Sequence, residues 1–214
     1  MKHVKSPIEG ASTSTDKPPG RRALAKQNTR AKVLKAARRL FSEQGYEGAT
    51  IRDIAEAAGM STGAVFASFA DKSDLFHEIM VGDIAAVTAD MRQAAAHGRS
   101  VEDALLRIFT AGYAFYKGQL HLARAAFTVS WLMGDERPIL SVETLYEIIA
   151  DQLDQAILKG ELFQASDVRL RTEMLFDSYL ANYRHAIHGG WSLDQLQARS
   201  RDQIRVILAG ARQS

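Results

Sequence analysis

Cysteine is absent from the 214 residues, so disulfides cannot stabilise the fold and thiolate metal sites are excluded. Long apolar runs are absent as well, and none approaches the roughly 18 residues that a membrane-spanning helix requires. Residues 1–23 lack the apolar segment that follows the positive charges of a secretory signal. These absences predict a soluble, cytoplasmic protein with no membrane partner.

The composition is that of a globular protein with an uneven charge distribution. Apolar residues make up 46% of the chain and charged residues 24%, and a chain of this length can bury a sizeable core. Residues 1–39 hold eleven Lys/Arg and two acids, whereas the remainder holds 16 basic and 23 acidic residues. This layout favours an anionic partner at one end of the molecule, and a solvated basic tail is the alternative interpretation.

Nearly every segment from Leu24 onward has the apolar spacing of an amphipathic helix, as Val33, Ala37, Leu40 and Phe41 illustrate. No run alternates strictly between apolar and polar residues, so no sheet is expected. The fold is therefore predicted to be all-α, with about nine helices. Turn and cap residues place these helices at about 24–44, 50–59, 62–69, 71–96, 100–118, 120–133, 139–159, 167–188 and 192–209.

The segment Thr50–Phe76, TIRDIAEAAGMSTGAVFASFADKSDLF, predicts a helix-turn-helix, because two short helices are joined by a tight turn that begins with Gly59. Apolar residues are expected to lock the pair at a fixed angle: Ile54, Ala55, Ala58, Val65 and Phe69. Residues 24–71 are therefore predicted to form a three-helix DNA-binding domain. A flexible basic arm of residues 1–23 precedes it, and a helical body of residues 72–214 follows.

Hydroxyl and carboxylate side chains at the helix starts predict caps. Thr50 and Asp53 have the spacing of a capping box, with Asp in place of Glu. Ser192 and Gln195 have the spacing of a second one, for the last helix, and Asp71 is expected to cap the fourth helix. Ser61 or Thr62 is expected to cap the second helix of the pair, so that its positive dipole end faces outward toward a phosphate oxygen. Gly63 has no side chain and lets the backbone come near a groove wall.

These residues match a known pattern over about a quarter of the chain. The matching positions are Thr50, the Ile-Ala-x-x-Ala-Gly run at 54–59, Ser61, Gly63, the aromatic at 66, Phe69, and Lys72 before Leu75. In these positions the sequence resembles the TetR (tetracycline-repressor) family of transcriptional regulators. The remaining helices agree with that family only in number and length. The resemblance implies a sequence-specific DNA-binding protein.

The resemblance also implies roles for individual residues. Thr50, Thr62 and Lys72 match positions that contact phosphates, and Arg52 is suited to bond a guanine. Phe66 departs from the tyrosine of many members and lacks the hydroxyl that would bond a phosphate. The predicted DNA-binding residues are Thr50, Arg52, Ser61, Thr62, Gly63, Ala64, Phe66, Ala67, Ser68 and Lys72.

For the helical body, the resemblance implies an effector cavity and a dimer interface. Four aromatic residues are predicted to bind an unknown small-molecule effector: Tyr113, Phe127, Trp131 and Tyr146. Aromatics at helical spacing also suit a packed core, which is the alternative. The last two helices carry wide apolar stripes, exemplified by Tyr179 and Ile204, and are predicted to form a homodimer interface that pairs with an inverted-repeat operator.

Enzymatic alternatives find less support in the sequence. Residues 59–63 fit the G-x-S-x-G nucleophile elbow, but that elbow requires a strand before the serine, and the preceding residues predict a helix. His185 and His188 are two ligands at most, too few for a metal site. We therefore predict no catalytic residue, metal or cofactor, and a ligand-responsive repressor. A regulator without an effector, or an all-α enzyme or adaptor, is the alternative.

Overall fold

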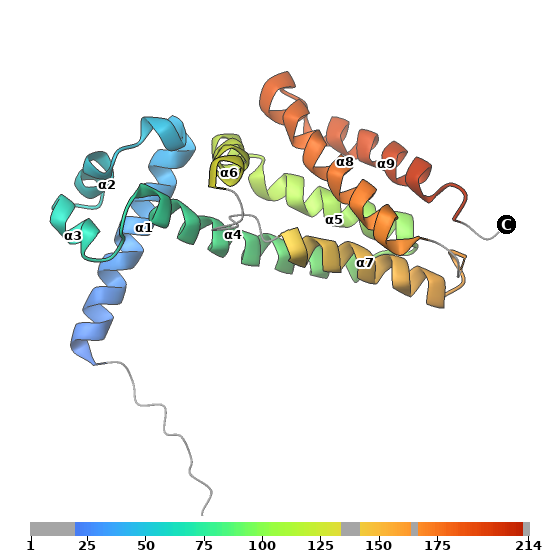
Figure 1. Ribbon diagram of the computed structural model, residues 1–214, viewed down its shortest axis with the longest axis horizontal. Coiled ribbons are helices and arrows are strands. Elements are labelled where there is room, and N and C mark those ends of the chain that lie inside the picture. The colour runs from blue at the N-terminus through green and yellow to red at the C-terminus, as the bar shows by residue number, and fades with distance from the viewer. Residues whose placement is uncertain (1–19, 134–141, 164–166, 212–214) are drawn as a thin grey trace, which may run out of the picture.

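A computed structural model describes residues 20–133, 142–163 and 167–211, and within these ranges the chain forms nine helices and no strand (Figure 1). The all-α prediction is therefore confirmed. No helix in the described ranges is long and apolar enough to cross a membrane. The helices are α1 Arg21–Gly48, α2 Ile51–Ala57, α3 Thr62–Phe66, α4 Lys72–Ala95, α5 Val101–Tyr116, α6 Leu120–Met133, α7 Val142–Leu158, α8 Val168–Gly189 and α9 Leu193–Leu208.

The helices form a small domain and a larger helical body (Figure 1). The domain, α1 to α3, lies at one end of the molecule, and α4 leads from it into the body. In the body α4 packs along α5, and α8 packs against both α7 and α9. Helix α6 packs against α1, so the domain contacts the body through α6 as well as through α4.

The helix boundaries follow from the caps that the sequence predicts. The Thr50–Asp53 and Ser192–Gln195 capping boxes both form, and Asp71 caps α4. Gly59 adopts a left-handed conformation, with a φ of 69°, in the turn between α2 and α3. Some predicted boundaries were wrong: α1 begins at residue 21, within the predicted arm, and α2 ends at Ala57. Helix α3 ends at Phe66, and beyond it the N–H groups of Ser68 and Phe69 both donate to the Val65 carbonyl.

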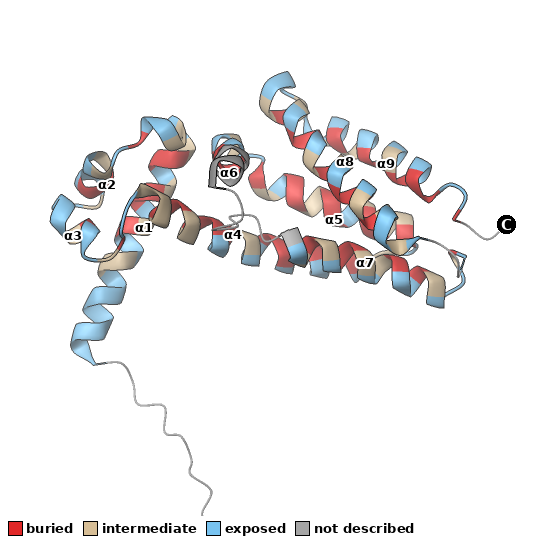
Figure 2. Ribbon diagram, in the orientation of Figure 1, coloured by how far each residue is buried: buried red, intermediate tan, exposed pale blue. Residues whose placement is uncertain are grey.

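The core explains the wide apolar stripes of the last two helices. Leu175, Tyr179 and Tyr183 of α8 are buried within the chain, as are Leu196 and Ile204 of α9 (Figure 2). The prediction that these particular residues face a second copy was therefore wrong. They pack inside the body: α9 lies against α5 and α8, and Tyr179 of α8 stacks on Tyr113 of α5. The large apolar residues of the two helices that are exposed are Leu170, Met174 and Val206.

Candidate DNA-binding surface and ligand cavity

Helices α2 and α3 pack through one apolar face and leave the other face of α3 open. Val65 of α3 is buried together with Ile54 and Ala55 of α2. Phe66, one residue further along, has 54% of its surface exposed, which is unusual for so large an apolar side chain. The predicted lock between the two helices is confirmed, and the outward face of α3 carries Thr62, Gly63, Phe66 and Ala67.

Ser61 is the cap of α3. Its Oγ accepts a hydrogen bond from the backbone N–H of Ala64 at 3.2 Å, so the choice between Ser61 and Thr62 falls to Ser61. The residues before Ser61 belong to α2 and the turn that follows it, so no strand precedes the serine in this part of the described chain. The structural context of a nucleophile elbow is therefore missing at residues 59–63.

Thr50 and Arg52 lie at the start of α2. Thr50 Oγ1 and Asp53 Oδ2 are 2.6 Å apart within the capping box, and Arg52 is exposed. Ala64 and Ser68 are half-buried, and they are less available to a groove than their neighbours Gly63 and Ala67. The DNA contacts of these residues remain predictions. Because Arg52 and the open face of α3 are exposed, they are the best placed of the predicted residues to reach base edges.

Lys72 is bound within the chain. Its ammonium donates hydrogen bonds to the carbonyl oxygens of Tyr46 at 2.8 Å and Ala49 at 3.2 Å, and it lies 4.3 Å from the centre of the Tyr46 ring. It thereby ties the start of α4 to the C-terminal end of α1. Two of the three N–H groups of the ammonium are used within the chain, so one N–H remains for the predicted hydrogen bond to a phosphate.

Two arginines of the basic N-terminal stretch are also paired within the chain. Arg30 forms an ion pair with Glu78, and Arg38 forms one with the buried Asp83. A second nitrogen of Arg38 donates to Gln119 Oε1 at 3.0 Å. The sequence-based charge count therefore overstates the charge available to an anionic partner. It missed these pairs because the partners lie on other helices.

An apolar cavity of about 70 Å³ opens in the body between α4, α5, α6, α7 and α8. The polar groups of its wall are mostly bonded already: Tyr183 donates to the Gly112 carbonyl at 2.8 Å, and the Tyr179 and Tyr183 hydroxyls are 3.0 Å apart. Burial is the main cause that raises the pKa of the Tyr116 hydroxyl, and the negative charge of Asp83 raises it further. The hydroxyl is therefore protonated. The lining includes Met80, Val87, Met91, Tyr116, Phe176 and Tyr183.

Of the four residues predicted to bind an effector, Tyr113 and Tyr146 do not line this cavity. Tyr113 is buried, and its hydroxyl lies 3.3 Å from the Tyr179 carbonyl and 3.2 Å from the Asn182 amide. Tyr146 packs on Phe176, with 4.6 Å between ring centres, and is not among the residues that line this cavity. The side chains of Phe127 and Trp131 lie outside the described residues. Sequence reasoning missed the methionines of α4, whose helical spacing is equally that of a core.

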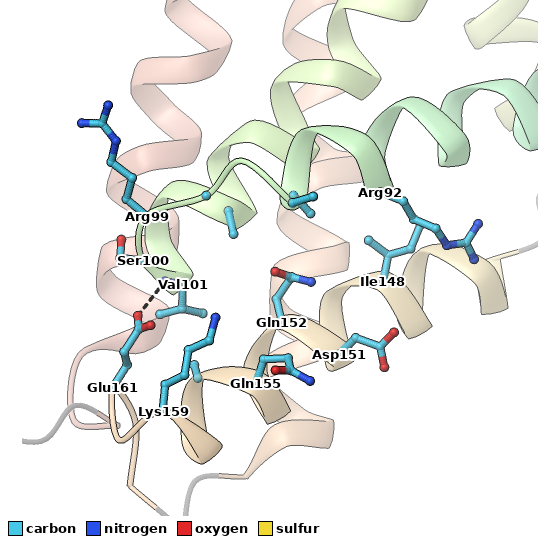
Figure 3. A pocket seen from close by; sticks show the side chains of 15 residues that line it. Arg92, Arg99, Ser100, Val101, Ile148, Asp151, Gln152, Gln155, Lys159 and Glu161 are labelled. Carbon is cyan, nitrogen blue, oxygen red and sulfur yellow. Dashed lines mark hydrogen bonds between the residues drawn. The ribbon is translucent and has the colours of Figure 1, made fainter.

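A larger and more polar cavity, of about 290 Å³, lies where α4 ends and α5 begins (Figure 3). Its charged residues have both signs, with Arg92 and Lys159 beside Asp151 and Glu161. Glu161 Oε2 accepts a hydrogen bond from the Val101 N–H at 2.8 Å, so the chain's own carboxylate occupies the start of α5. Nothing here selects one ligand charge, and we assign this cavity no function.

Comparison with known proteins places the helix-turn-helix among bacterial regulators. Residues 33–79 match the family described as "Bacterial regulatory proteins, tetR family". The transcriptional repressor AcnR of Corynebacterium glutamicum is 55% identical over 49 residues, which cover 23% of this chain and 26% of that protein. This chain therefore matches only about a quarter of the repressor's length.

Two further likenesses extend over most of the chain. The repressor KstR2 of Rhodococcus jostii is 28% identical over 178 residues, covering 81% of this chain and 87% of that protein. The crystal structure of FadR from Bacillus subtilis, in complex with stearoyl-CoA, superposes with a TM-score of 0.67 at 18% identity and covers 84% of this chain and 98% of that one. The body as well as the small domain thus has the fold of such regulators.

Proposed function

We propose that this chain, which belongs to the TetR family of transcriptional regulators, binds an inverted-repeat operator as a dimer, represses transcription there, and releases the DNA when a small molecule enters its helical body. The observation that carries the proposal is the open face of α3. Phe66 is 54% exposed beside Gly63 and Ala67, while Val65 behind them is fully buried. A short helix with a buried back and an uncovered front, on which Phe66 lies beside the small Gly63 and Ala67, suits a major groove.

Selection of bound sequences from a random DNA pool, at near-physiological salt, tests this function. We expect one inverted repeat to be enriched, and the mass of its complex to correspond to an even number of chains. A folded protein that enriches no sequence would contradict sequence-specific binding. Enrichment of a single half-site by a monomer would contradict the dimer and leave the DNA-binding assignment standing.

The proposed dimer interface is the outer surface of α8 and α9. Leu170 and Met174 lie one helical turn apart on α8 and are 51% and 46% exposed, and Val206 on α9 is 70% exposed. Of these three, Met174 belongs to the apolar stripe predicted for α8, and Leu170 and Val206 lie outside the predicted stripes. Two copies that meet through this surface would place two α3 helices on one face of a duplex, as an inverted repeat requires.

The proposed effector site is the apolar cavity between Met80 and Tyr183. Its wall offers apolar surface and few unbonded polar groups, so an apolar ligand is favoured. FadR, which shares the fold, was crystallised in complex with stearoyl-CoA, and this supports an effector with an apolar chain. A regulator of the same fold without an effector is the second candidate. The two differ in whether any ligand lowers operator affinity, since an effector must prefer the state that does not bind DNA.

Replacing Phe66 with tyrosine is expected to strengthen operator binding. The side chain is exposed, so the added hydroxyl enters no packed core and can donate to a phosphate. One such bond contributes about 1 kcal/mol, or about five-fold in the dissociation constant. Fluorescence anisotropy on the selected operator measures the effect. Phe163→Tyr, at a 44% exposed phenylalanine of the body, is the matched control and should leave binding unchanged. Equal affinities for Phe66→Tyr and the parent would contradict a phosphate beside residue 66.

A further inference from the structure

The guanidinium of Arg30 joins α1 to α4 and to the turn that follows α3. Arg30 lies on α1, and its Nε donates to Glu78 Oε1 of α4 at 3.0 Å, while Nη2 donates to Glu78 Oε2. Its Nη1 donates to the backbone carbonyl of Ser68 at 2.7 Å, just beyond α3. The same group lies 4.3 Å from the centre of the Phe69 ring. All of these bonds are long-range, so they fix tertiary geometry.

The end of α3 is the part of the motif that most needs such a restraint. The helix has only five residues, too few to be stable without packing. Its buried anchor is Val65, to whose carbonyl both Ser68 and Phe69 donate their backbone N–H groups. The Ser68 carbonyl points outward from this turn and is held by Arg30. A shift of that carbonyl would move the helix that presents Gly63 and Phe66.

Glu78 determines the orientation of the Arg30 guanidinium. The carboxylate accepts hydrogen bonds from Nε and Nη2, and Nη1 is then oriented to donate to the Ser68 carbonyl. Lysine has the same charge but no planar fork, so it cannot bond Glu78 through two nitrogens while a third bonds the Ser68 carbonyl. Both side chains are about one-third exposed, at 37% for Arg30 and 33% for Glu78, so the pair adds little to global stability.

We propose that Arg30 is a positioning residue for DNA recognition: it sets the end of α3 against α1 and α4 without contacting DNA, and Glu78 orients it. This inference rests on the proposed DNA-binding function. It contradicts the simplest reading of the basic N-terminal stretch, in which every arginine of α1 serves as a phosphate contact. The two readings predict opposite results for the removal of the Glu78 charge.

Substitution Glu78→Gln separates the two readings. A phosphate-contacting Arg30 would be freed by the loss of its partner, and the added net positive charge would tighten binding to every duplex. A positioning Arg30 loses its alignment instead, so affinity for the selected operator falls about ten-fold while affinity for an unrelated duplex of equal length does not fall. Glu43→Gln, at an exposed residue of α1, makes the same charge change and should affect both duplexes alike.

Arg30→Lys and the double variant Arg30→Lys/Glu78→Gln complete the cycle. We expect Arg30→Lys to lose operator affinity about ten-fold with an unchanged slope of affinity against salt, because no phosphate contact is lost. The double variant should bind no worse than either single variant. Thermal unfolding within a few degrees of the parent verifies that each variant is folded. Full operator affinity in Glu78→Gln or in Arg30→Lys would overturn the inference, whereas a parent protein that selects no operator would overturn the proposed function itself.

Discussion

Replacing Gly63 with alanine is expected to leave the fold intact and to weaken operator binding about ten-fold or more. A Cβ at this position would meet only the Ser61 Oγ, at 3.9 Å, and the backbone is in an ordinary helical conformation. Nothing within the described chain therefore requires glycine, and alanine is the better helix former by up to about 1 kcal/mol. A requirement for glycine here must come from a surface that approaches α3 from outside.

The experiment compares thermal unfolding and operator affinity in the same set of variants. Gly82→Ala is the matched control, because Gly82 lies within α4, is exposed, and has nothing within 4 Å of a Cβ. It should gain stability and bind the operator normally. Gly59→Ala should instead lose stability, because its φ of 69° strains any other residue. If Gly63→Ala bound the operator as tightly as the parent, α3 would not approach a groove wall at this residue.

The second large effect is expected at the junction between the DNA-binding domain and the body. Asp83 of α4 is 3% exposed, and burial raises the pKa of its carboxyl, while its hydrogen bond to Arg38 opposes that rise. Its Oδ2 has no hydrogen-bond partner among the residues that the structure describes. Arg38→Ala should therefore leave a buried, unpaired carboxylate. We expect a loss of about 2 kcal/mol at pH 7.5, reduced from the value for a fully buried pair because Arg38 is 36% exposed.

This loss should depend on pH with a definite sign. Without Arg38 the pKa of Asp83 rises further in the folded state, so the folded protein holds a proton that the unfolded chain releases. Stability of the variant then falls as the pH rises from the ordinary aspartate range through the raised pKa, and the loss relative to the parent is smaller at pH 5 than at pH 7.5. Chemical denaturation at both values measures it.

Adding Asp83→Asn to Arg38→Ala provides the control. The amide carries no charge, so the double variant should be more stable than Arg38→Ala at pH 7.5 and should show no additional pH dependence over the parent. A cost of Arg38→Ala that is equal at both pH values would mean that the carboxylate of Asp83 is not the group left unpaired. In that case the loss of the Gln119 contact would account for it.

Contacts between residues that are only a few positions apart along the chain could be predicted from the sequence. The caps at Thr50, Asp71 and Ser192 form as expected, because a cap is a hydrogen bond between a side chain and a backbone N–H two or three residues later. The packing of α2 against α3, with Val65 and Ile54 buried, was predictable as well, because these apolar residues are close together in the sequence. Such contacts depend on spacing along one or two helices, which the sequence displays directly.

The contacts decided by tertiary structure join residues far apart in sequence. Arg30 meets Glu78 across 48 residues, and Arg38 meets Asp83 across 45, so two cations counted toward a DNA partner are bound within the chain. Tyr179 and Tyr183, read as part of a dimer stripe, instead fill the core beside the apolar cavity. Periodicity identifies the apolar or charged face of a helix, but only the packing of helices determines whether that face meets the core, a cavity, another helix or a partner molecule.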